Sequence, residues 1–204
     1  MNPPSLTCVF HSSSSIAALL NSPAGRLIAG DLLIECAPSP ALSFGLNLET
    51  PVTYPGIAGL LGGVEISSLA NATDRLPVPI VLAPGASSTP AVTRAALALL
   101  PPPDEHLQHL TLLVPMSYAP ALGATLAMAT QFTIAWDVSE FPHEELSDFA
   151  RWLGRECLLD RGSFQGVIAY ASQPLDAGHK ERITALLAPL ATARHPARVI
   201  TLAS

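Results

Sequence analysis

Residues 110–136 read LTLLVPMSYAPALGATLAMATQFTIAW, and this stretch decides between a membrane-spanning segment and a globular core. It has no charged side chain and is long enough to cross a bilayer. Pro115 and Pro120 interrupt it, however, with Ser117 and Tyr118 between them. Because a proline inside a helix removes a hydrogen bond and clashes with the preceding turn, one long helix is disfavoured. The stretch instead predicts a strand, a turn, a short helix and a second strand.

The same order of elements recurs from residue 79 onward. Apolar runs, each followed by a turn and then a helical pattern, lie at 80–83, 110–114, 132–136 and 167–171, and a last run lies at 198–203. Alternating strands and helices are typical of right-handed crossover units. We therefore predict a three-layer α/β fold, Rossmann-like, with a mostly parallel sheet of about five to seven strands and helices on both faces.

One domain is expected over residues 1–204, because no linker or change of composition divides the chain. The repeating strand-turn-helix units fill residues 79–204. Residues 1–78 are less regular and contain a region rich in Pro and Gly at 38–63, where we expect a loop or hairpin followed by a short helix that begins near Pro55.

Composition excludes several classes of function. The net charge is −6 and Lys180 is the only lysine, so we expect no nucleic-acid partner. Three widely spaced cysteines can form neither a disulfide framework nor a C-x-x-C metal motif. No Lys or Arg precedes the first apolar run, as a signal or transit peptide would require. We expect a soluble, cytoplasmic protein that does not bind a membrane.

Several nucleotide and hydrolase motifs are missing. The chain has no G-x-x-x-x-G-K-[ST], no G-x-G-x-x-G after its first apolar run and no G-x-S-x-G. We therefore predict neither a P-loop nucleoside triphosphatase nor a dinucleotide-binding protein of the Rossmann type, nor an α/β-hydrolase. His106 and His109 are better explained as a solvated connection than as ligands, so no metal site is expected, and the cofactor stays unknown.

Short polar turns follow the predicted strands, at the carboxyl ends where open parallel sheets bind their ligands. After residues 80–83, hydroxyl groups lie beside the free N–H groups of a predicted helix that starts at Pro90, which suits an anion. The simpler interpretation is an ordinary N-cap, which needs only one hydroxyl group. From such turns we predict a set of ligand-binding residues: Gly85, Ser87, Ser88, Thr89, Ser12, Ser13, Tyr118 and Ser172.

Three residues in these turns are predicted to be catalytic: Asp137, His11 and Ser117. Asp137 directly follows the apolar run 132–136, where a carboxylate could serve as a general base. Its simpler role is that of a turn or capping aspartate. The turns form one crevice only if their strands are neighbours, and the sequence does not give the strand order.

Two hypotheses of function follow. The first is a small-molecule-binding domain whose chemistry, if it is an enzyme, acts on an anionic or carbonyl-containing metabolite. Arg26, Arg75 and Arg94 are the only Lys or Arg residues before residue 151, so a neutral or singly charged ligand fits better than a highly charged phosphate. The alternative is a non-catalytic assembly subunit, a homo-oligomer or the partner of another protein. Its interface would be the helix at 120–130, which is apolar or small all round and therefore predicted to be buried on both sides.

Overall fold

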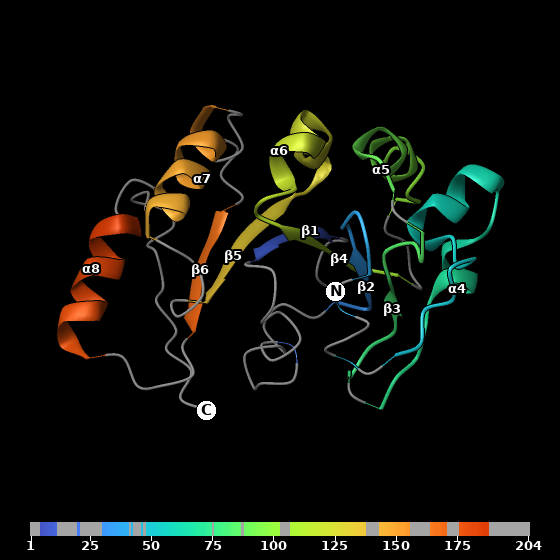
Figure 1. Cartoon of the computed structure of the whole chain (residues 1–204), viewed down its shortest axis with the longest axis horizontal. Coiled ribbons are helices and arrows are strands. Elements are labelled where there is room, and N and C mark those ends of the chain that lie inside the picture. Colours follow the sequence, from blue (N-terminus) through green and yellow to red (C-terminus); the bar gives the residue numbers. More distant parts are fainter. Residues whose placement is uncertain are drawn as a thin grey trace.

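The computed structural model describes residues 5–11, 20, 30–40, 42, 46, 48–74, 76–86, 88–102, 107–137, 143–155, 164–170 and 176–187. Six strands form one sheet in the order β3-β2-β4-β1-β5-β6 (Figure 1). Their bounds are β1 Ser5–His11, β2 Leu32–Glu35, β3 Ile80–Val81, β4 His109–Pro115, β5 Gln131–Asp137 and β6 Phe164–Tyr170. Every pair of neighbouring strands is parallel, which confirms the predicted parallel sheet.

Helices cover one face of this sheet, which we call the α5–α7 face. They are η1 Gly56–Gly62, α4 Ile66–Leu69, α5 Pro90–Leu97, α6 Ala119–Leu122, η2 Gly123–Met128 and α7 His143–Arg155. In Figure 1, α5, α6 and α7 lie in a row along this face, and α8 Ala177–Leu187 lies beyond α7. Buried side chains of alternate strand residues, such as Cys8, Phe10 and Leu112, pack against these helices.

The opposite face, which we call the Leu20 face, has its own apolar layer. Val9, Leu33 and Leu113 point to this side and pack with Leu20, Leu42 and Leu46, which are helical. The central strands are buried from both sides, which explains why they read as continuous apolar runs instead of alternating ones. The three layers of the predicted fold are therefore confirmed.

The helix predicted at 120–130 needs correction. Gly123 has φ 53° and ψ −135°, a conformation that other residues rarely adopt, and it separates the single turn of α6 from the 3-10 turns of η2. Leu122 and Leu126 are buried, whereas Pro120, Ala124 and Met128 are exposed. The segment is thus buried on one side only. Within the described residues, no helix combines the length and hydropathy that crossing a membrane requires.

Candidate functional site

The carboxyl end of β1 lies between the carboxyl ends of two neighbouring strands. His11 is in register with Pro115 of β4 and with Ala135 of β5. The amide of Met116 donates to the carbonyl oxygen of His11 at 2.8 Å. Leu20, in the connection after β1, packs on the Leu20 face, whereas the connections after β4 and β5 form helices on the α5–α7 face. Connections that diverge in this way define a topological switch point, where open parallel sheets bind ligands.

All three residues predicted to be catalytic belong to this switch point. His11 ends β1, Asp137 ends β5, and Ser117 lies two positions after the end of β4. His11 is only 2% exposed, and strand alternation places its side chain with that of Val9, on the Leu20 face. Ser117 is exposed. The side chain of Asp137 lies outside what the structure describes, so a shared catalytic role stays a prediction.

The turn at Gly85–Thr89 lies apart from this switch point. It follows β3, an edge strand that β2 and β4 separate from β1. The amide of Gly85 donates to the Tyr54 carbonyl at 2.9 Å, and a Cβ atom at position 85 would collide with the Pro51 carbonyl. Glycine is therefore required here by the close approach of the preceding loop. The strand order does not bring this turn together with Asp137.

Other residues of the predicted ligand set have local roles. Thr89 caps α5, because its hydroxyl oxygen accepts from the Val92 amide at 3.4 Å. The Ser88 amide donates to the Pro38 carbonyl at 2.9 Å. The hydroxyl of Tyr118 lies 3.3 Å from that of Thr93 in α5. The remaining predicted positions, Ser12, Ser13, Ser87 and Ser172, lie outside the described residues.

Glu35 is the residue at this edge that sequence reasoning missed. It ends β2, is 1% exposed, and accepts the Leu42 amide on Oε1 and the Ala83 amide on Oε2, each at 2.8 Å. Its carboxylate therefore ties the segment after β2 to the segment after β3. An acidic residue directly after the apolar run 32–34 was the available signal.

Buried thiols lie close to this carboxylate. Burial raises the pKa of the Cys36 thiol, and the negative charge of Glu35 adds to the effect. Burial also raises the pKa of Cys8, with Cys36 as a second cause. Because the thiolate is the nucleophile, both cysteines are unreactive at neutral pH and belong to the core. No group of three or more metal-binding side chains occurs among the described residues.

Positive charge is missing from the sequence that follows each strand. The segments 12–25, 36–54, 82–89, 116–118, 138–142 and 171–175 contain neither Lys nor Arg. Arg94 lies in α5, where its guanidinium donates to the Ala121 carbonyl at 3.0 Å. The only lysine, Lys180, lies in α8. Among the described residues, this edge therefore offers hydroxyl and backbone groups to a ligand, because the buried Glu35 carboxylate is already bonded to two backbone amides.

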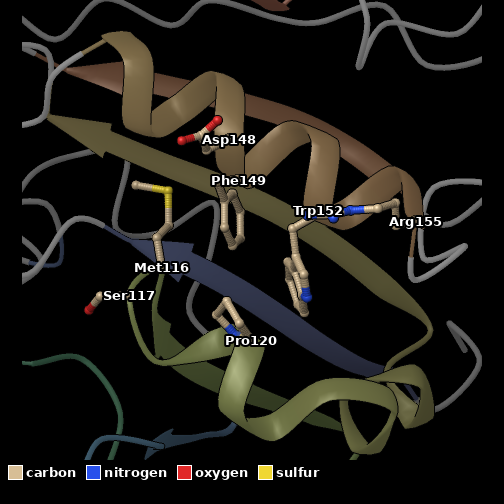
Figure 2. A pocket seen from close by; sticks show the side chains of 7 residues that line it. All are labelled: Met116, Ser117, Pro120, Asp148, Phe149, Trp152 and Arg155. Carbon is tan, nitrogen blue, oxygen red and sulfur yellow. The ribbon is translucent and has the colours of Figure 1, made fainter.

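A cavity of about 330 Å³ opens between the start of α6 and α7 (Figure 2), and we call it the α6–α7 cavity. Met116 and Pro120 face Phe149 and Trp152 across it. The rings of Phe149 and Trp152 lie 5.3 Å apart and both pack on Phe10, so this wall of the cavity is firmly supported. Its other lining residues are polar: Ser117, Asp148 and Arg155.

Comparison with known proteins shows likeness in fold alone. No protein-family model matches the chain, and no curated protein matches it in sequence. Apo McdA from Cyanothece has a TM-score of 0.66 and 16% identity, and the alignment covers 98% of this chain and 86% of McdA.

Two further solved structures have the same fold. One is cobyrinic acid a,c-diamide synthase from Mycobacterium smegmatis, solved with an ATP analogue and magnesium, which has a TM-score of 0.61 and 15% identity. The alignment covers 91% of this chain and 82% of the synthase. The septum site-determining protein MinD from Pyrococcus horikoshii, solved with Mg-ADP, has a TM-score of 0.59 and 12% identity. The alignment covers 98% of this chain and 81% of MinD.

Proposed function

We propose that this protein is a cytoplasmic assembly subunit that uses the sheet of an ATP-binding fold without hydrolysing nucleotide. McdA and MinD have been solved with ATP or ADP, so the frame suits nucleotides in those proteins. In this chain the frame would serve to present a surface to a second copy of the chain. Two features support the proposal, the charge at the carboxyl edge and the exposed face of α6 and η2.

The charge at the carboxyl edge is the observation that carries the proposal. A bound triphosphate is held by Lys or Arg side chains, by helix N-termini and by a metal ion. The segments after the six strands contain no Lys or Arg, and the sequence has no phosphate-binding loop. The Glu35 carboxylate is buried and accepts from two backbone amides, so it adds negative charge where a phosphate group would need positive charge. Phosphate binding at this edge would therefore be weak.

The outer side of α6 and η2 supports the choice of an assembly role. Pro120, Ala124 and Met128 are exposed there, in a stretch without charged residues from 110 to 136. These three residues form a stripe that begins at the α6–α7 cavity, which Pro120 lines. The stripe ends at a second cavity of about 290 Å³, which is lined by Met128 together with Leu100 and Pro101. Exposed apolar side chains that lie close together are typical of protein-protein contacts, and here the exposed Arg94 borders them through its bond to the Ala121 carbonyl.

The experiment compares the wild type with Ala124→Arg by light scattering coupled to size exclusion. We expect the wild type to exceed the mass of a monomer, because the uncharged stripe is covered by a partner. A buried arginine at position 124 should remove that association. The matched control is Val52→Arg, a change at a residue that is 75% exposed on a different loop, which should leave the mass unchanged. A monomeric wild type would contradict a homo-oligomeric role.

Nucleotide binding is measured in parallel by calorimetry with Mg-ATP and Mg-ADP. We expect no saturable heat and no hydrolysis. Micromolar binding of either nucleotide would overturn the proposal.

A second candidate function is favoured by the strand order alone. His11, Ser117 and Asp137 follow three neighbouring strands at a switch point, which suits a neutral or singly charged ligand. A ligand present at a hundred times its dissociation constant should stabilise the fold by about 2.7 kcal/mol, which a thermal-shift screen of carboxylates and acyl esters would detect. Loss of that shift in both Ser117→Ala and Asp137→Ala would support this function, and a shift that survives both would exclude these residues.

A further inference from the structure

We propose that the second cavity, of about 290 Å³, binds a small, neutral, apolar molecule with roughly the size of two fused benzene rings. We call it the Leu100 cavity, after one of the residues that line it. The inference goes beyond the proposed function and does not depend on it, because a single chain forms the cavity.

The Leu100 cavity lies at the amino edge of the sheet, opposite the switch point. Leu6 and Leu110 line it from the starts of β1 and β4, where they are in register with each other. Both belong to the core, with exposed fractions of 7% and 1%. Pro101 and Pro102, which follow α5, also line the cavity, and proline rings have no rotamer freedom to lose. These walls are therefore fixed before a ligand arrives, which lowers the cost of binding.

The polar groups of this lining are already bonded within the chain. Among the described residues that line the cavity, Thr130 has the only polar side chain. Its hydroxyl donates to the Leu6 carbonyl at 3.1 Å and accepts from the Leu6 amide at 3.2 Å. The Leu100 amide donates to the Leu97 carbonyl at 3.1 Å, and the two prolines have no N–H. An ordered water needs about two to four polar partners, so water here is readily displaced by an apolar molecule.

The charges around the cavity indicate a neutral ligand. None of the described residues that line it is charged. Asp104 and Glu105 follow Pro102 closely in the sequence, and their placement lies outside the described residues. Arg94 is the nearest positive residue before them in the sequence, and its guanidinium donates to the Ala121 carbonyl at 3.0 Å. A carboxylate would therefore lose its hydration without gaining a counter-charge, which is costly.

The size of the ligand follows from the volume. An apolar cavity of about 150 Å³ holds benzene, so about 290 Å³ has room for roughly two fused rings. Met128, which is 38% exposed, lines the cavity at its open side together with the exposed Pro102. Methionine is unbranched and adapts to irregular shapes, so Met128 can adjust its side chain to a bound molecule.

The probes are 2-naphthol and 2-naphthoate, which share one ring system and are neutral and anionic at neutral pH. Binding is measured by fluorescence titration. We expect saturable binding of 2-naphthol, with one molecule per chain, and binding of 2-naphthoate that is at least about tenfold weaker. Contacts between probe protons and the Met128 methyl group in NMR spectra should locate the bound ring. Equal affinities for the two probes, or no saturable binding of 2-naphthol, would overturn the proposal.

Met128→Trp tests the position of the site, because the larger side chain fills the cavity. It should weaken binding of 2-naphthol at least about tenfold. Leu61→Trp is the matched control, since Leu61 is 48% exposed on η1 and is not among the residues that line the cavity, and it should bind as the wild type does. Circular dichroism of each variant confirms folding. Undiminished binding in a folded Met128→Trp would show that the site lies elsewhere.

Ala124→Arg separates this inference from the proposed function. The variant is expected to lose association, whereas residue 124 is not among those that line the Leu100 cavity. It should therefore bind 2-naphthol at least as tightly as the wild type. Loss of binding in this variant would contradict a site formed by a single chain, and a monomeric wild type that binds 2-naphthol would count against the assembly role alone.

Discussion

At the scale of single residues, Glu35 shows how a polar side chain in the core can be structural at a position that looks functional. The carboxyl edge of a parallel sheet is where catalytic acids are expected. Glu35 stands there, buried at the end of β2, yet both of its oxygens accept backbone amides of flanking segments. Hydrogen bonds to a charged acceptor contribute more than neutral ones, so this residue should matter more for stability than for chemistry.

We expect Glu35→Gln to lower the free energy of unfolding by about 2–4 kcal/mol. The amide side chain keeps the size of the carboxylate but turns one acceptor into a donor that faces a backbone N–H. Urea denaturation measures the loss. Glu49→Gln is the control, because Glu49 is exposed and its replacement should change stability by about 0.5 kcal/mol or less. Equal effects of the two substitutions would contradict the structural role.

Among the residues predicted to form a site, the sequence could indicate only the type of chemistry. An N-cap before Pro90 was the simpler interpretation, because Ser or Thr before a proline at the first helical position is a local signal, and Thr89 fills that role. The need for Gly85 could not be seen, because it arises from the Pro51 carbonyl, which comes from a loop distant in sequence.

At the scale of elements, the segment 110–136 shows which parts of a pattern carry information. Its prolines predicted a strand, a turn, a helix and a strand, and β4, α6 and β5 confirm that order. The interruption at Gly123 and the exposed side of η2 were missed. A helix that is apolar or small all round has no polar side, so its pattern cannot indicate which side faces outward.

Gly123 gives a prediction at this scale. Its conformation is one that essentially only glycine adopts, and a Cβ atom there would meet no neighbour within 4 Å. Gly123→Ala should therefore destabilise the fold by about 1–3 kcal/mol through backbone strain alone. Gly62→Ala is matched to it, since position 62 is equally open but has no positive φ. Thermal unfolding of both variants provides the measurement, and equal melting temperatures would refute the argument.

At the scale of the whole molecule, the strand order decides which turns meet, and it was not predictable. Alternating strands and helices predicted a parallel sheet because crossovers are right-handed. The same alternation is compatible with many orders of strands. The structure places β1 between β4 and β5, and β3 at the edge, so His11, Ser117 and Asp137 share a switch point from which the turn at Gly85 is excluded. Contacts between distant segments determine that order, and they leave no local pattern in the chain.

The central claim is that this protein associates through its uncharged surface and does not depend on nucleotide. It is tested most directly by sedimentation equilibrium of the wild type with and without Mg-ATP, over a wide range of protein concentration. The account predicts a mass that rises from monomer toward dimer with concentration and is unchanged by Mg-ATP. A mass that stays monomeric at every concentration, or that becomes dimeric only when Mg-ATP is added, would contradict it.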